Sequence, residues 1–228
     1  MHAMILAAGR GERMRPLTDR LPKPLLPVAG KPLIVWHLEK LARAGIHDVV
    51  INHAWLGHII EAQLGDGTQF GLNIRYSAEP TALETAGGIA QALPMLGPEP
   101  FLVINGDVWC DWDMTAAQHI ATELTTQSLL GWLLLVPNPV HHPEGDFALS
   151  ASGFVSASGI NRYTFAGIGI YDPALLRSTV CGQPAKLAPL LREAMSRQAV
   201  SGTLHTGTWV DVGTPQRLAE LDLMVSSQ

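Results

Sequence analysis

The residues best suited to chemistry lie in one short stretch near the N-terminus. An apolar run from Met4 to Ala8 ends at Gly9, and the next 22 residues hold six of the chain's 15 lysines and arginines. These cations are Arg10, Arg13, Arg15, Arg20, Lys23 and Lys31. Six cations against two acids give the segment a net charge of +4, whereas the whole chain carries −5. This clustering predicts a bound anion.

The glycines of this stretch indicate what kind of anion it is. Gly9 and Gly11 could begin a dinucleotide-binding fingerprint, but Met14 stands where that fingerprint needs its third glycine. A Walker A motif is also excluded, because no Gly-Lys-Ser/Thr follows. What remains is a glycine loop whose backbone N–H groups can approach a phosphate, with Arg13 and Lys23 to neutralise it. The alternative is a solvated basic loop, which the charge clustering makes less attractive.

The elements that must position this loop alternate along the chain. Strand patterns rich in valine, isoleucine and leucine predict strands over 4–8, 49–51, 72–77, 101–104, 129–136, 165–171, 200–205 and 209–212. Helical patterns cover 32–44, 55–64, 84–93, 115–124, 187–197 and the residues after 214. Such alternation predicts an α/β fold with a mainly parallel sheet. Ligands of such sheets bind beyond the carboxyl ends of strands, so the loops after Ala8 and Ile104 are the places to look.

Composition sets further limits. The 228 residues, 47% hydrophobic, fit a single domain in which the loosely patterned segment 137–164 forms a flap. The acidic net charge argues against nucleic-acid binding, and the longest apolar run, 129–136, is too short to span a membrane. Cys110 and Cys181 form no CxxC pair, and no signal peptide opens the chain. We therefore expect a cytoplasmic protein with free thiols.

A longer motif surrounds the glycine loop. Residues 6–14 read Leu-Ala-Ala-Gly-Arg-Gly-Glu-Arg-Met, and Pro-Lys-Pro-Leu and Gly-Lys-Pro follow at 22–25 and 30–32. This pattern resembles the signature of the sugar-1-phosphate nucleotidylyltransferases. The resemblance implies a Rossmann-like, three-layer fold with a mixed, mainly parallel sheet. It also implies the following roles: nucleotide binding by Leu6, Ala7, Ala8, Gly9 and Gly11, and catalytic contacts to the triphosphate by Arg13 and Lys23.

A second block, residues 79–88, resembles the base-reading segment of the same family. The resemblance implies that Glu79 and Thr85 contact the base, while Glu84 stands where the family usually has glycine. Gly87 and Gly88 lie within a predicted helix, where each costs about 1 kcal/mol relative to alanine. We expect them to let the backbone approach a planar ring, although tight helix packing is an alternative.

Two acids complete the resemblance. Asp107 follows a predicted strand in Asn-Gly-Asp, and Asp211 lies in Trp-Val-Asp-Val-Gly-Thr-Pro; both resemble metal ligands of the family. Mg²⁺ needs only one or two carboxylates when phosphates and water fill its other positions. The resemblance therefore implies Mg²⁺ bound by Asp107 and Asp211. The nine histidines supply no second set, because the adjacent His141 and His142 cannot face one ion at helical spacing.

The sugar side has weaker signals. Glu144 and Gly145 fall where a family loop meets the sugar, and Asn105 and Asn161 are further candidates for sugar binding. Lys186 is either an anion contact or a solvated helix start, and we favour the latter.

The reaction implied by the resemblance joins a nucleoside triphosphate to a sugar-1-phosphate and releases pyrophosphate. The chain length and the loop 141–147 most resemble members that use UTP and N-acetylmuramate-1-phosphate in peptidoglycan recycling. The alternatives are a guanylyltransferase acting on mannose-1-phosphate, another hexose-1-phosphate enzyme, or a regulator that binds nucleotide sugars without turnover. We expect a minimal catalytic domain over 1–228, sugar-binding from about 137 onward, without the C-terminal β-helix of many relatives, and monomeric.

Overall fold

One mixed sheet runs through the computed structural model, which describes residues 1–227. Its nine strands are β1 (His2–Leu6), β4 (Asp48–His53), β5 (Asn73–Ala78), β6 (Phe101–Asn105), β8 (Gly131–Val136), β9 (Phe147–Leu149), β10 (Val155–Ser156), β11 (Arg162–Tyr171) and β12 (Val200–Leu204). The order is β10-β9-β11-β6-β1-β4-β5, and β8 pairs with β11 and β12. Strands β6, β1, β4 and β5 are parallel, and β11 joins them antiparallel to β6. The predicted mixed sheet is confirmed.

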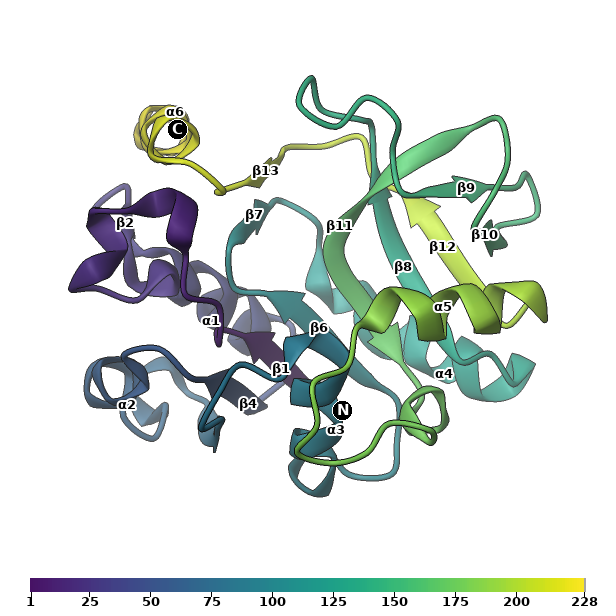
Figure 1. Ribbon diagram of the computed structural model, residues 1–228, viewed down its shortest axis with the longest axis horizontal. Coiled ribbons are helices and arrows are strands. Elements are labelled where there is room, and N and C mark those ends of the chain that lie inside the picture. The colour runs from purple at the N-terminus through teal and green to yellow at the C-terminus, as the bar shows by residue number, and fades with distance from the viewer. Residues whose placement is uncertain (228) are drawn as a thin grey trace.

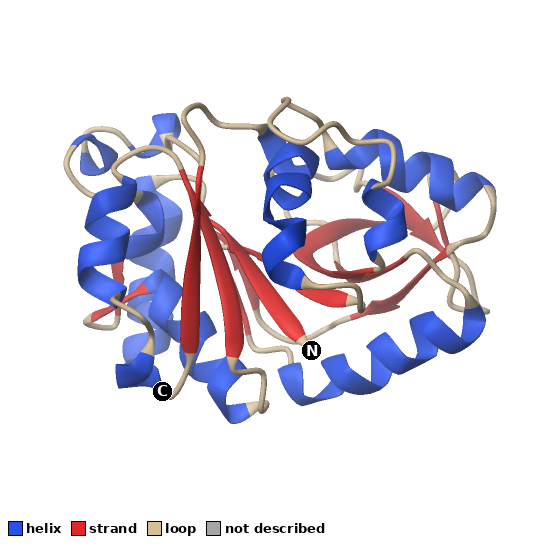
Figure 2. Ribbon diagram, turned by 90° about the horizontal axis from the view of Figure 1, so that it is seen from below, coloured by secondary structure: helices blue, strands red, loops and turns tan. Residues whose placement is uncertain are grey.

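Helices cover both faces of this sheet (Figure 2). Side chains alternate along each strand, so that Ala3 and Ile5 of β1 face one side and Met4 faces the other. On the first face lie α1 (Leu33–Arg43), α2 (Gly57–Leu64) and α4 (Ala117–Gln127); on the second lie α3 (Glu84–Leu96) and α5 (Leu187–Ser196). The expected three-layer α/β architecture is confirmed.

A smaller third core lies at the end of the molecule marked by α6 (Pro215–Ser226) in Figure 1. There α6 packs on the hairpin of β2 (Pro27–Val28) and β3 (Lys31–Pro32) and on the antiparallel pair of β7 (Val108–Cys110) and β13 (Trp209–Asp211). The backbone N–H of Ala29 donates to Asp222 Oδ1 at 2.7 Å. The C-terminal segment is thereby fastened to the basic loop and to the turn after β6.

The structure differs from the predicted elements mainly in short strands. Strands β2, β3, β7, β9 and β10 have two or three residues each, too few to show the alternation that identifies a strand. The first strand ends at Leu6 rather than Ala8, so Ala7 and Ala8 belong to the loop. Helix α3 runs on to Leu96 with Pro94 inside it.

Helix α1 carries two polar side chains into the protein interior. His37 is 2% exposed, and its Nε2 has no hydrogen-bond partner in the described part of the chain. Burial, with a smaller effect of the nearby Lys40, lowers the pKa of His37 to about 4. Lys40 donates to the carbonyl oxygen of Cys110 and lies 4.8 Å from the ring centre of Trp109, which ties α1 to β7.

The buried imidazole predicts how stability depends on pH. Unfolded His37 binds a proton below its ordinary pKa of 6.5, whereas the folded protein keeps it neutral down to about pH 4. The free energy of unfolding should therefore fall by about 3 kcal/mol in all as pH drops through this window. Urea unfolding between pH 4 and 7 measures this. His37→Leu should flatten the curve, and the exposed control His119→Leu should not. An unchanged curve in His37→Leu would contradict this account.

Candidate active site

Three cavities open along the carboxyl ends of β1 and β6, and Asn105 lines all of them. The loop cavity, about 210 Å³, is lined by Leu6, Ala7, Gly9, Lys23, Pro24, Thr85, Asn105 and Asp107. The acidic cavity, about 400 Å³, contains Asp107 and Asp211; the aromatic cavity, about 270 Å³, contains Phe147 and Phe165. Because Asn105 lines each of them, the three cavities adjoin one another. Gly167, at φ +75°, lets β11 pass within contact of the Asn105 amide.

A buried chain of hydrogen bonds fixes the turn after β1. The N–H of Ala7 donates to Asn52 Oδ1 at 2.9 Å, and Asn52 Nδ2 donates to Glu79 Oε1 at 2.6 Å. Glu79 Oε2 accepts from the N–H of Leu83 at 2.8 Å. Glu79 is 5% exposed and both its oxygens are engaged, so it supports the wall of the loop cavity from behind. Its expected contact to a base stays a prediction.

Gly87 and Gly88 make room for protein groups. A Cβ on Gly88 would lie 2.6 Å from Glu79 Oε1, and one on Gly87 would lie 2.4 Å from the carbonyl oxygen of Gln183. The expectation that these glycines face a planar ring is therefore corrected. The space beside Gly88 is filled by Glu79 and Asn52, and the space beside Gly87 by the backbone of residues 183–185. Tight packing, the alternative interpretation, describes both positions.

The basic loop uses part of its charge to hold its own shape. Arg10 donates to Asp19 Oδ1 at 2.9 Å, and its guanidinium lies 3.9 Å from the ring centre of Trp55. Arg15 donates to the same oxygen at 2.8 Å. The hydrogen bond from Arg10, with that from Arg15, lowers the pKa of the Asp19 carboxyl from its ordinary value. Arg10 and Arg15 are thus assigned to loop structure.

Three further cations of the loop, Lys31, Arg13 and Lys23, differ in how exposed their side chains are. Lys31 pairs with Glu39 at 2.7 Å, whereas Arg13 is exposed on a short 3₁₀ helix (Glu12–Met14) and makes no ion pair with any described residue. Lys23 is only 8% exposed and lines the loop cavity. Gly11 is needed for shape, since a Cβ there would meet Thr18 at 2.9 Å.

The two predicted metal ligands face the same cavity. Strand β13 pairs with β7 so that Asp211 lies opposite Val108, one residue beyond Asp107. Lys23 Nζ lies 2.5 Å from Asp107 Oδ2, and Arg217 Nη1 lies 2.9 Å from Asp211 Oδ2. Each carboxylate therefore has one oxygen against a cation, and its other oxygen has no hydrogen-bond donor among residues 1–227. Two hard oxygen donors beside a cavity of this size fit a divalent cation such as Mg²⁺.

A second group of metal-donor atoms lies nearby. Donor atoms of Cys110, Asp111 and His205 lie within 4.8 Å of one another, a grouping hidden in the sequence by a separation of 94 residues. His205 Nε2 is 2.6 Å from Asp111 Oδ1, which accounts for the arrangement without a metal. Burial raises the pKa of the Cys110 thiol to about 11, which disfavours the thiolate that a metal binds.

The sugar-side predictions fall on one anchored loop. The Arg162 guanidinium donates to the carbonyl oxygens of Glu144 and Gly145, each at 3.1 Å, and of Asp146 at 2.9 Å. Asp146 lines both the acidic and the aromatic cavity, whereas Glu144, Gly145 and the exposed Asn161 line none of the three. Of the predicted sugar residues, Asn105 alone lines a cavity, and the roles of the other three stay predictions.

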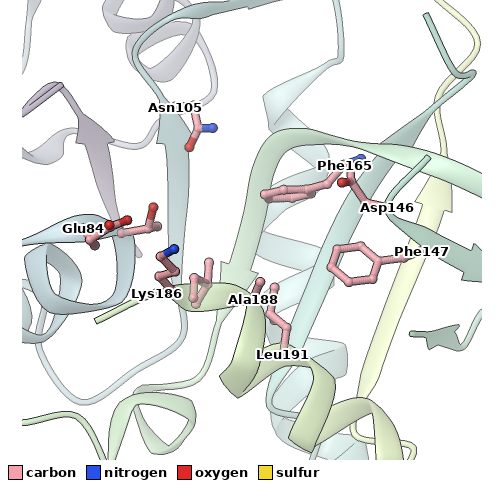
Figure 3. Close-up of a pocket in the computed structure, with 10 residues that line it drawn as sticks. Glu84, Asn105, Asp146, Phe147, Phe165, Lys186, Ala188 and Leu191 are labelled. Atoms are coloured by element: carbon pink, nitrogen blue, oxygen red, sulfur yellow. Dashed lines mark hydrogen bonds between the residues drawn. The ribbon is translucent and has the colours of Figure 1, made fainter. Parts of the chain in front are cut away.

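Sequence reasoning missed the far wall of the site. Asp146, Phe147, Phe165 and Lys186 line the aromatic cavity (Figure 3). Asp146 Oδ2 accepts from the N–H of Phe165 at 2.8 Å, which joins the loop to β11. Asp146 and Phe147 lie in the loop 141–147 that resembles the family, but the sequence assigned them no contact. The pairing of β9 with β11 and the position of α5 bring this wall beside Asn105. The sequence did offer one signal, the lysine directly before a strongly amphipathic helix.

Comparison with known proteins identifies the class. The profile of the family described as nucleotidyl transferase matches residues 2–145, so the chain belongs to this family. It is 56% identical over 230 residues to the N-acetylmuramate alpha-1-phosphate uridylyltransferase of Neisseria meningitidis serogroup B, covering 100% of this chain and 99% of that protein. The enzyme of the same name from Caulobacter vibrioides is 35% identical over 224 residues, covering 94% and 92%.

More distant relatives and solved structures agree on the fold. Mannose-1-phosphate guanyltransferase of Hypocrea jecorina is 31% identical, covering 95% of this chain and 62% of that protein. A proposed glucose-1-phosphate thymidylyltransferase from Bacillus anthracis superposes with a TM-score of 0.86 at 22% identity, covering 100% and 96% of the two chains. A UDP-glucose pyrophosphorylase gives 0.79 at 18%, covering 100% and 99%. Within residues 1–227, no helix has the length and apolar character needed to cross a membrane.

The buried hydrogen-bond chain behind Ala7 generates a stability prediction. Asn52→Ala leaves the Ala7 N–H and one Glu79 oxygen without partners in the interior, and should lower the free energy of unfolding by about 3 kcal/mol. The matched control is Asn73→Ala, whose amide donates to Asp48 in solvent and should change stability by less than about 0.5 kcal/mol. Urea unfolding of both variants makes the comparison, and equal losses would contradict the assigned role.

Proposed function

We propose that this protein transfers the uridylyl group of UTP to N-acetylmuramate-1-phosphate, giving UDP-N-acetylmuramate and pyrophosphate. The observation that carries the proposal is the 56% identity, over the full chain, to an N-acetylmuramate alpha-1-phosphate uridylyltransferase. In our proposal the nucleotide occupies the loop cavity and the sugar phosphate the other two, so that residues from about 137 onward bind the sugar. The reacting groups then meet beside Asn105.

The proposed transfer needs charge neutralisation and alignment of the two substrates more than it needs a general base. An oxygen of the sugar phosphate attacks the α-phosphorus of UTP, and the bond to the β-phosphate oxygen breaks, so that pyrophosphate leaves with the electron pair. The second pKa of a phosphate monoester is ~6, so the nucleophile is mostly dianionic at neutral pH. The protein must therefore bring two polyanions together in line and neutralise their charge.

Lys23 and Arg13 are proposed to supply this neutralisation. Lys23 is nine-tenths buried in the loop cavity, where water screens its charge little. Arg13 is exposed beside the same loop and is free of ion pairs among the described residues, so it can close onto phosphate oxygens. Backbone groups of Leu6, Ala7, Ala8, Gly9 and Gly11, with the side chain of Thr85, are proposed to contact the nucleotide.

Asp107 and Asp211 are proposed to hold Mg²⁺. When bound, the ion would add positive charge where the phosphates meet. Lys23 and Arg217 each pair with one oxygen of these carboxylates, which leaves the other oxygen of each available beside the cavity. Since UTP is an intracellular metabolite, we place the reaction in the cytoplasm, within peptidoglycan recycling, and propose a monomer.

The test is pyrophosphate release across four nucleoside triphosphates and four sugar-1-phosphates, with and without Mg²⁺. The sugars are the 1-phosphates of N-acetylmuramate, N-acetylglucosamine, mannose and glucose. UTP with N-acetylmuramate-1-phosphate and Mg²⁺ should give the highest kcat/KM, and omission of the metal should abolish the signal. A maximum at GTP with mannose-1-phosphate would favour the runner-up, which relatives at 31–34% identity support. Binding without any release would indicate a regulator.

A further inference from the structure

We propose that the aromatic cavity is a subsite for a carboxylate carried by the sugar, and that Lys186 binds this carboxylate. The inference rests on the proposed function, because N-acetylmuramate differs from N-acetylglucosamine by a lactyl ether that ends in a carboxylate. Such a group is an anion on an otherwise neutral sugar ring, and its burial is unfavourable unless a cation or several donors meet it.

Lys186 is well placed to supply a cation for this contact. Among the residues that line the acidic and aromatic cavities, it is the single one with a permanently cationic side chain. Lys23 lines the loop cavity instead, where it is already paired with Asp107. Lys186 itself makes no ion pair with any residue in 1–227. The sequence favoured a solvated lysine at the start of a helix, whereas the cavity lining favours a contact between Lys186 and a ligand.

The backbone beside Lys186 adds positive potential. Lys186 is the N-cap residue of α5, and Leu187 and Ala188 of the first turn line the same cavity. No side chain caps this helix end, so first-turn N–H groups are free to face an anion. The positive end of the helix dipole and the ammonium group therefore both add positive potential to this cavity.

The apolar wall of the cavity suits the rest of the lactyl group. Phe147 is 4% exposed and Leu191 2%. In Figure 3 the side chains of Ala188 and Leu191 lie on α5, and that of Phe147 lies on the far side of the cavity from Lys186. A lactyl ether presents a methyl group next to its carboxylate, so an apolar surface beside one cation matches it. Phe165, across the cavity, offers a flat face for the sugar ring.

The acids of the cavity leave Lys186 free for a ligand. Asp146 is held by the N–H of Phe165 at 2.8 Å and by His142 Nε2 at 3.2 Å. Glu84 lies on the same side as Lys186 in Figure 3 but forms no ion pair with it within the described chain. Glu84 has φ +61°, a left-handed conformation that favours glycine. A ligand carboxylate that reaches Lys186 directly would compete successfully with this more distant charge.

The experiment compares two ligands that differ only in the lactyl ether. Binding of UDP-N-acetylmuramate and of UDP-N-acetylglucosamine is measured by calorimetry with wild type, Lys186→Met, Lys186→Arg and the control Arg192→Met. Arg192 is an exposed cation of the same helix that lines none of the three cavities. Lys186→Met should weaken binding of UDP-N-acetylmuramate about tenfold or more and leave UDP-N-acetylglucosamine within twofold. Lys186→Arg should restore most of the preference, and Arg192→Met should not alter it.

Each other outcome overturns a stated part of the inference. A wild-type preference for UDP-N-acetylmuramate that Lys186→Met keeps would overturn the subsite and leave the proposed function standing. Equal weakening of both ligands by Lys186→Met would assign the lysine to the nucleotide or to folding, and thermal unfolding separates these two. A wild-type protein without preference between the ligands would overturn the subsite, while failure of UTP with N-acetylmuramate-1-phosphate to release pyrophosphate would overturn the proposed function.

Discussion

The site depends on one constraint, the parallel alignment of β1, β4 and β6. Parallel strands place their carboxyl ends at one edge of a sheet, so the turn after β1, Asn52 in β4 and the Asn-Gly-Asp turn after β6 meet there. Asn52 converts this proximity into fixed geometry, because it accepts from Ala7 and donates to Glu79 in the interior. The loop cavity is the space that this arrangement leaves beside the strand ends.

Charge is then distributed around that edge in pairs. Two cations that are largely buried, Lys23 and Arg217, each neutralise one oxygen of a carboxylate, and the two carboxylates face one cavity. A buried unpaired charge is costly, so the pairs let the protein keep four charges close together in the absence of ligand. A polyanionic substrate can enter such a site because cations and carboxylates are both already in place.

The sequence predicts those parts of the fold and the site that have a long strand pattern or a contiguous motif. The α/β sheet could be predicted because its strand patterns are strong, and motifs marked Lys23 and Asp107, which the structure places in the loop cavity. Asp211 was marked by its motif and lies in a predicted strand, but its pairing could not be predicted because the partner strand β7 has only three residues. Asp146 and Lys186 could not be assigned, since the pairing of the flap with β11 and the packing of α5 on α3, β10 and β12 bring them to the cavity that Asn105 lines. Glu79 belongs to the base-reading motif, and the structure adds that both its oxygens are hydrogen-bonded within the protein, a feature that the motif does not encode.

The central claim is that Asp107 and Asp211 share one metal ion at the junction of the cavities, and anomalous diffraction from crystals grown with Mn²⁺ and UDP-N-acetylmuramate tests it most directly. The account predicts an anomalous peak within coordination distance of both carboxylates, about 2.2 Å from an oxygen of each, with the sugar lying over Phe165. A peak seated instead among Cys110, Asp111 and His205, or none near Asp107 and Asp211, would contradict it.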